Sequence, residues 1–134
     1  MMNGLGQRNH FSVEWLIEPT SNFQQAVYFY KEIIGLRLIE EGVAQTDYHF
    51  NRYAQFRLDN GITLEIVEPK EEYKDLFVHP IRSVKVDNLR AHRHRLIEKG
   101  VVFISDILDS GTGDGWTYFQ GADGFIVQLE GTLE

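Results

Sequence analysis

Glu65 and Gln128 stand at equivalent places in two similar segments of the chain. Residues 61–66 read Gly-Ile-Thr-Leu-Glu-Ile, and residues 124–129 read Gly-Phe-Ile-Val-Gln-Leu. A carboxylate can take a proton from a substrate or bind a metal ion. An amide can offer its oxygen as a ligand, but it brings neither charge nor basicity. The first chemistry to consider is therefore proton transfer or metal binding centred on Glu65.

Strand alternation predicts which way these residues face, because successive side chains of a strand point to opposite sides of the sheet. The apolar neighbours should pack under a helix and leave the polar residues facing a cavity. The residues expected on the helix side are Leu64, Ile66, Val84, Val86, Val127 and Leu129. The residues expected on the cavity side are Thr63, Glu65, Val67, His79, Ile81, Ser83, Lys85, Ile126, Gln128 and Glu130.

The first expected strand, 11–17, is assigned by the same alternation. The residues expected in its core face are Phe11, Val13, Trp15 and Ile17. The residues expected on its cavity face are His10, Ser12, Glu14 and Leu16. Glu14 is thereby a second candidate for a catalytic base beside Glu65.

Two helices are predicted by apolar residues at helical spacing between a capping side chain and a glycine. The first begins after Asn22, with Ser21 as the alternative cap, and ends at Gly35. The second begins after Asn88 and ends at Gly100. Strands are expected around these helices, over 11–17, 36–44, 50–58, 62–67, 81–86, 101–108, 116–120 and 125–130.

This order of one strand, one helix and three strands occurs twice, and similar segments lie roughly 65 residues apart, which indicates an internal repeat. We expect an α+β fold in which chain 1–134 forms one domain of two βαβββ half-repeats, roughly 10–68 and 79–131. Since a half of about 60 residues would be marginal alone, the two halves should share a core. An unrelated α+β domain with accidental symmetry is the alternative.

The composition restricts the function classes. The chain has 134 residues, of which 43% are hydrophobic, a formal charge of −7 and no cysteine. Its acidity disfavours nucleic acid as a partner, because the phosphates would repel it. The lack of cysteine excludes thiol catalysis, thiolate metal sites and disulfides. No segment has the pattern of a signal peptide or a membrane span, so we expect a cytoplasmic protein without a membrane partner.

Three segments resemble motifs of a known family. Residues 26–36 are similar to a helix that ends in FYxxxLGL, residues 84–101 to VxDLxxxxxRLxxxGV, and residues 118–129 to FxDPDGxxxEL, with Gly-Ala in place of Asp-Pro. In this order they resemble the vicinal oxygen chelate superfamily, which includes glyoxalase I, bleomycin resistance proteins and extradiol dioxygenases. The resemblance implies a half-barrel of mixed β-sheet with helices on its convex face, a small-molecule site on the concave face, and a homodimer.

The resemblance also implies one metal ligand from each of four strands. Glu65 and Gln128 stand at two of these positions. A direct match at the third position gives Ile81, so His79 and His10 complete the set only after a shift along two strands. The set His10, Glu65, His79 and Gln128 would suit one divalent ion, Zn, Ni, Fe or Mn. We favour the simpler interpretation, in which both histidines are polar residues at strand starts and there is no metal.

Two function classes fit these residues. The first is a glyoxalase-like enzyme, a lyase or isomerase, in which Glu65 or Glu14 moves a proton beside a carbonyl group of a small molecule. The second is a metal-free dimer that resembles the bleomycin resistance proteins and binds a cationic or planar small molecule in an acidic groove. We favour the enzyme, because Glu65 facing a cavity serves better as a base or ligand than as scaffold. The candidate substrate contacts are Ser12, Arg57, Trp116 and Tyr118.

Overall fold

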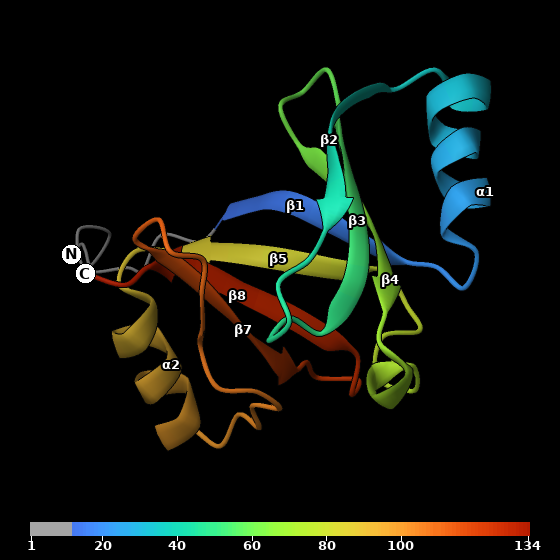
Figure 1. The fold of residues 1–134 in the computed structure, drawn as a ribbon. Helices are drawn as coiled ribbons and strands as arrows, with labels where there is room; N and C mark the ends of the chain where they lie inside the picture. Colours follow the sequence, from blue (N-terminus) through green and yellow to red (C-terminus); the bar gives the residue numbers. More distant parts are fainter. Residues whose placement is uncertain (1–11) are drawn as a thin grey trace.

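The computed structural model describes residues 12–134, and Figure 1 shows how they are arranged. The first half contains β1 (Ser12–Pro19), α1 (Phe23–Tyr28), η2 (Phe29–Ile34), β2 (Arg37–Val43), β3 (Phe50–Arg57) and β4 (Thr63–Pro69). The Asn22 side chain caps α1 as predicted, because its Oδ1 accepts a hydrogen bond from the backbone N–H of Gln25 at 3.2 Å. α1 continues directly into η2, a π-helical segment that ends at Gly35 in the left-handed conformation.

The second half repeats this order. It contains β5 (Ile81–Val86), α2 (Leu89–Glu98), β6 (Leu108–Asp109), β7 (Asp114–Gln120) and β8 (Ile126–Thr132), and η3 (Glu71–Tyr73) lies in the connection between the halves. The Asn88 side chain accepts a hydrogen bond from the backbone N–H of Ala91 at 3.2 Å and so caps α2. Among the described residues, no helix is long and apolar enough to cross a membrane.

The strands of residues 12–134 form one curved, mixed sheet in the order β2-β3-β4-β1-β5-β8-β7-β6. β1 and β5 pair antiparallel at its centre, where the two halves meet. Each of them pairs in parallel with the last strand of its own half, β4 or β8. The halves are therefore arranged symmetrically, and the predicted α+β fold with two βαβββ units in a half-barrel is confirmed.

Apolar side chains gather in three clusters that follow this architecture. Phe23 of α1 packs against Phe56 and Ile66 in the first cluster. Leu89 of α2 packs against Val86 and Leu129 in the second. The third cluster, on the concave side, joins residues of both halves: Ile17, Val67, Phe77, Ile81, Tyr118 and Ile126. The helices thus cover the convex face, while the concave cluster holds the two halves together.

The predicted faces of β4, β5 and β8 are confirmed, whereas β1 follows its predicted faces only as far as Val13 and is reversed from Trp15 onward. Trp15 pairs with Thr63 and Ser83, and Ile17 pairs with Glu65, so both lie on the concave side. The register shifts between Val13 and Trp15, which marks an irregularity in the strand. Such a bulge interrupts the alternation on which the prediction depends.

The expected strand 101–108 is also much shorter in the structure. β6 comprises only Leu108–Asp109, and Phe103 forms a single isolated bridge with Phe119. The side chains of this segment still contribute to folding, because Phe103 and Ile107 pack against the cluster under α2. The apolar pattern of residues 101–108 therefore reflects packing under α2 rather than pairing within the sheet.

Candidate functional site

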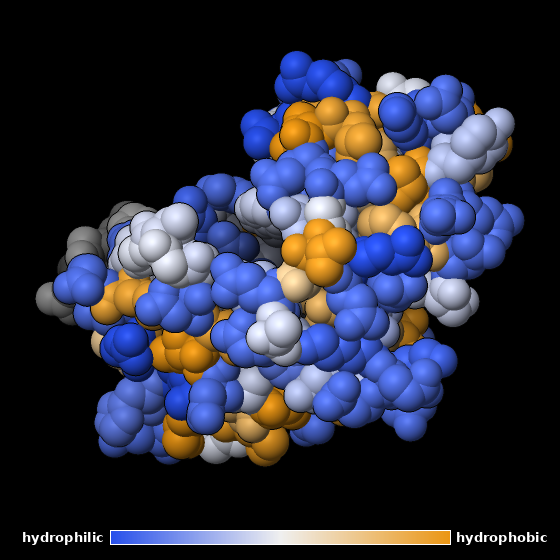
Figure 2. Space-filling view, viewed as in Figure 1, coloured by the Kyte–Doolittle hydropathy of each residue, from blue (hydrophilic) through white to orange (hydrophobic). Residues whose placement is uncertain are grey.

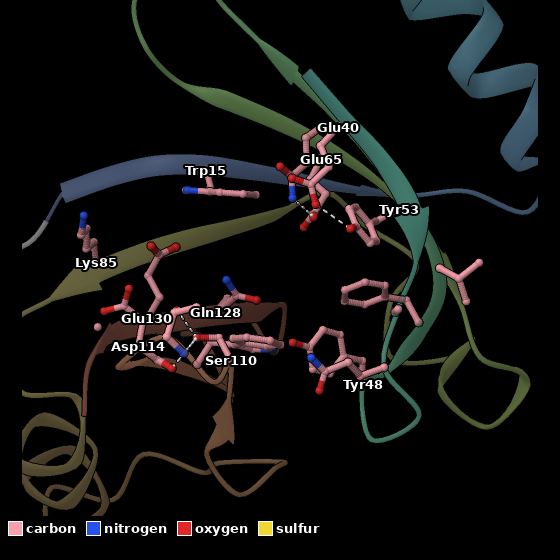
Figure 3. A pocket seen from close by; sticks show the side chains of 18 residues that line it. Trp15, Glu40, Tyr48, Tyr53, Glu65, Lys85, Ser110, Asp114, Gln128 and Glu130 are labelled. Atoms are coloured by element: carbon pink, nitrogen blue, oxygen red, sulfur yellow. Dashed lines mark hydrogen bonds between the residues drawn. The ribbon is translucent and has the colours of Figure 1, made fainter. Parts of the chain in front are cut away.

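A cavity of about 510 Å³ opens on the concave face of the sheet. Figure 2 shows the surface hollowed at this place, and Figure 3 shows the side chains that surround the hollow. Residues of β1, β2, β3, β4, β5, β7 and β8 line it. Since both halves contribute walls, the cavity depends on the way the halves pair at the centre of the sheet.

Glu65 on β4 lies in the wall of this cavity and is only 8% exposed. Gln55 on the neighbouring β3 donates a hydrogen bond from Nε2 to Glu65 Oε2 at 2.9 Å. Burial raises the pKa of Glu65 to about 7; the hydrogen bond from Gln55 opposes this shift, and the charges of Glu130 and Glu40 add to it. A carboxyl group with such a pKa can both accept and return a proton near neutral pH.

Gln128 on β8 is uncharged, and its orientation is set by a chain of hydrogen bonds. Its Nε2 donates to Ser83 Oγ at 2.8 Å, and the Ser83 hydroxyl donates to the Glu130 carboxylate. Because the hydroxyl proton is directed to Glu130, Ser83 accepts from the amide nitrogen, and the amide oxygen of Gln128 stays available. Burial raises the pKa of Glu130, and the hydrogen bond from Ser83 opposes that shift.

Glu40 on β2 lies beside Glu65, whereas Glu130 and Asp114 lie across the cavity from them (Figure 3). The Tyr53 hydroxyl donates to Glu40 Oε2 at 2.6 Å. This hydrogen bond and the burial of the ring raise the pKa of Tyr53 to about 12. Carboxylates therefore occupy two opposite walls of the cavity.

Aromatic rings make up much of the remaining wall. In the described part of the chain they are Trp15, Tyr48, Phe50, Tyr53 and Trp116. The rings of Tyr48 and Trp116 meet edge to face, with centroids 4.7 Å apart. Burial raises the pKa of Tyr48, so its hydroxyl stays protonated near neutral pH. Rings of this kind offer apolar faces to a planar ligand.

The structure brings three of the predicted site residues, Glu65, Gln128 and Trp116, into the cavity lining. Tyr118 lies in the concave apolar cluster, where it is 2% exposed. Three other predicted residues, Ser12, Glu14 and Arg57, are exposed and do not belong to the cavity lining. Glu14 instead forms an ion pair with Lys85 at 3.5 Å. His10 lies outside the described residues.

The described residues do not fit the metal site that the resemblance implies. His79 is exposed, its ring packs against Phe125 with centroids 4.7 Å apart, and it is not part of the cavity lining. Ile81 is buried in the concave apolar cluster. Within residues 12–134, no group of three or more His, Asp or Glu side chains is placed to hold a metal ion.

Two carboxylates of the cavity, Glu40 and Asp114, were not among the residues predicted from the sequence. Glu40 faces the cavity because the pairing of β2 with β3 shifts register between Leu38 and Glu40. Asp114 faces it because β7 begins at this residue, two positions before the expected start of the strand at residue 116. Sequence alternation does not show where a register shifts or at which residue a strand begins.

A family model of the Glyoxalase/Bleomycin resistance protein/Dioxygenase superfamily matches residues 12–129. The chain belongs to this superfamily. The match covers both half-repeats, so it confirms the resemblance of the three sequence segments to this group. A search of curated proteins gave no match.

Solved structures that resemble this superfamily member show the same fold at low sequence identity. A hypothetical protein, BH1468 from Bacillus halodurans C-125, superposes with a TM-score of 0.73 at 13% identity over 92% of this chain and 96% of its own. Methylmalonyl-CoA epimerase from Mycobacterium tuberculosis gives 0.70 at 18% identity over 90% and 87%. A variant of Streptomyces coelicolor methylmalonyl-CoA epimerase in complex with 2-nitronate-propionyl-CoA gives 0.69 at 15% identity over 91% and 97%.

Proposed function

We propose that this superfamily member is an isomerase-type enzyme that removes and returns a proton on the carbon next to a carbonyl group of a small molecule, with Glu65 as the base. The observation that carries the proposal is the buried carboxyl group of Glu65 in the cavity wall, with a pKa of about 7. Burying such a group is costly unless it is strongly paired, and a purely structural position would favour an apolar residue.

In the proposed reaction, ionised Glu65 takes the proton from the substrate carbon, and the electron pair moves into the carbonyl group to form an enolate. Return of the proton to the same carbon regenerates the substrate and appears only as exchange with solvent. With an α-hydroxy substrate, the hydroxyl proton moves to the former carbonyl oxygen, and protonated Glu65 then delivers its proton to the former carbonyl carbon, so that the carbonyl group moves by one position. Gln55 holds the carboxylate through its 2.9 Å hydrogen bond. Tyr48 lies in the lining, and its hydroxyl can donate a hydrogen bond to the enolate oxygen.

The epimerase names of two similar structures are consistent with this type of reaction, because an epimerase inverts a stereocentre, which removal and return of a proton can achieve. They do not support the same substrate. The cavity lining contributed by the described residues holds four carboxylates and one lysine. This charge disfavours a CoA ester, which carries several phosphate charges of its own.

Deuterium exchange tests the reaction. The protein would be incubated in D2O with a panel of small α-hydroxy and α-amino aldehydes and ketones, and mass spectrometry would follow deuterium on the carbon next to the carbonyl group. We expect exchange with the wild-type protein and a loss of at least about 100-fold in Glu65→Gln, because the base is removed.

Glu32→Gln is the matched control, since Glu32 is an exposed carboxylate on η2, outside the cavity lining. It should exchange at the wild-type rate. Equal rates in the wild-type protein and Glu65→Gln would refute the assignment of Glu65 as the base.

A metal-free binding protein is the second candidate, and the aromatic walls of the cavity favour it. Five rings among the described residues give the cavity the character of a site for a planar ligand. Tight binding of a ligand from the panel without any deuterium exchange would favour this function over the enzyme.

We also propose a homodimer, following the resemblance to the superfamily. The face of α1 and η2 exposes apolar side chains that a second copy of the chain would cover: Tyr28, Phe29, Ile33 and Ile34. Sedimentation equilibrium at micromolar protein concentration distinguishes a dimer from the mass of 15.6 kDa expected for one chain.

A further inference from the structure

We propose that the substrate is an organic cation, a small molecule in which an ammonium group accompanies a planar or aromatic part. This inference rests on the proposed function, because it assigns a substrate class to the same cavity. It is carried by the charges, the free hydrogen-bond acceptors and the rings of the lining.

The charges of the cavity are strongly unequal. Among the described residues, the carboxylates of Glu40, Glu65, Asp114 and Glu130 face a single ammonium group, that of Lys85. Lys85 is itself engaged by Glu14 at 3.5 Å, and Glu14 lies outside the lining. The carboxylates come from four different strands and stand on opposite walls (Figure 3). A cation between these walls would be attracted from both sides.

Two buried side chains in this lining present acceptors that the protein leaves unused. Glu65 is 8% exposed, and Gln55 bonds only to its Oε2, so Oε1 has no hydrogen bond to any residue that the structure describes. Gln128 is also 8% exposed, and its amide nitrogen is held by Ser83. Its Oε1 likewise has no donor in residues 12–134. Both side chains line the cavity, so these oxygens can accept hydrogen bonds from a ligand that brings N–H groups.

The rings of the lining fit the other part of such a molecule. Trp15 and Tyr53 border the side of the cavity with Glu40 and Glu65, and Tyr48 borders the side opposite to Lys85 (Figure 3). The negative face of an aromatic ring attracts a cation, and its apolar surface packs against a planar group. An anion of the same shape would meet both the carboxylates and the negative ring faces.

Two probes with the same ring and opposite charge test this inference. Tryptamine carries an indole ring and an ammonium group at pH 8, whereas indole-3-propionate carries the same ring and a carboxylate. Isothermal titration calorimetry with the full chain at low salt should give at least about tenfold tighter binding of tryptamine. Equal binding of the two probes, or no binding of tryptamine at millimolar concentration, would overturn the substrate class.

A double variant separates the cavity from the overall charge of the protein. Glu40→Gln combined with Asp114→Asn removes two carboxylates of the lining, and we expect tryptamine to bind about tenfold more weakly. The matched control is Glu32→Gln combined with Glu98→Gln, which removes two exposed carboxylates of η2 and α2. If the control weakens binding as much as the double variant does, the attraction belongs to the whole surface and the inference fails.

The single variant Glu65→Gln distinguishes this inference from the proposed reaction. It should lose deuterium exchange and keep the preference for tryptamine, because the other carboxylates of the lining remain. Preference for tryptamine without any exchange in the wild-type protein would leave the substrate class standing and refute the reaction. Deuterium exchange that depends on Glu65, without a preference for tryptamine, would support the reaction and refute the substrate class.

Discussion

At the scale of single residues, Glu65 in the cavity wall is placed for proton transfer at a cost to the stability of the fold. Glu65 is ionised only with difficulty because it is buried, and the neighbouring carboxylates of Glu40 and Glu130 increase that difficulty. The pKa of about 7 cannot be predicted from the sequence around Glu65, since Gln55, Glu40 and Glu130 reach it from three other strands. The same burial that makes the group a useful base should make it a cost to folding.

The variant Glu65→Gln measures this cost. The pKa of Glu65 rises from 4.5 to about 7 on folding, so the folded protein binds the proton more tightly than the unfolded chain does. The stability from this proton is fully present below pH 4.5 and is lost as the pH rises through 7. At pH 8 we expect Glu65→Gln to raise the free energy of unfolding by about 2–3 kcal/mol, as measured by urea denaturation.

At pH 4.5 the same variant should differ little from the wild-type protein, because Glu65 then holds its proton in the fold. The substituted glutamine would keep the contact with Gln55, since an amide oxygen accepts the same hydrogen bond. A variant less stable than the wild-type protein at pH 8 would show that the Glu65 carboxylate contributes to folding and is not strained by burial.

At the scale of the elements, alternation predicts a strand correctly only where the strand is regular. The faces of β4, β5 and β8 follow the pattern, and this is why Glu65 and Gln128 were found from the sequence. β1 and β2 each contain a shift of register, which turns Trp15 and Glu40 toward the cavity. The order of the elements was predictable because it occurs twice, whereas a bulge leaves no mark in a hydrophobic pattern.

β5 and β8 approach each other closely at Gly131, and a substitution there tests how much this contact contributes to stability. Gly131 on β8 pairs with Val86 on β5, and a Cβ atom at Gly131 would overlap the carbonyl oxygen of Val86. Gly131→Ala must therefore push the two parallel strands apart, and we expect a loss of about 1–3 kcal/mol in the free energy of unfolding.

Gly121→Ala is the matched control for this substitution, because its Cβ atom would lie 3.3 Å from the nearest atom, the carbonyl oxygen of Phe125. It should cost less than Gly131→Ala in the same urea denaturation experiment. Equal stability of the wild-type protein and Gly131→Ala would mean that the contact between β5 and β8 adjusts without strain.

At the scale of the whole molecule, the two halves are joined at the centre of the sheet and again at one end of the concave face. His49 lies at this second junction, in the loop that precedes β3. Its ring contacts Tyr73 and Phe77 from the connection between the halves and Tyr118 from β7, with centroids 4.3, 5.7 and 5.1 Å away. The residue is 7% exposed, and its Nδ1 has no hydrogen bond in the described part of the chain.

Protonation of His49 should therefore loosen the contact between the halves. Burial lowers the pKa of His49 below 6.5, and the charge of Lys70 lowers it further, while Glu72 and Asp47 oppose the shift. The unfolded chain thus binds this proton more tightly than the fold does, and stability is lost as the pH falls below 6.5. The pH dependence of stability that comes from His49 has the opposite sign to the one that comes from Glu65. The two contributions are therefore separated only by comparing variants of each residue.

We expect His49→Phe to be more stable than the wild-type protein at pH 5.5 and the advantage to shrink at pH 8, where only the unpaired nitrogen, worth about 1 kcal/mol, is removed. Urea denaturation at the two pH values measures the difference, with His94→Gln as the control, because His94 on α2 is exposed. An advantage that does not change with pH would show that the junction tolerates the charge. A growing advantage in acid would identify His49 as the residue through which pH acts on the packing of one half against the other.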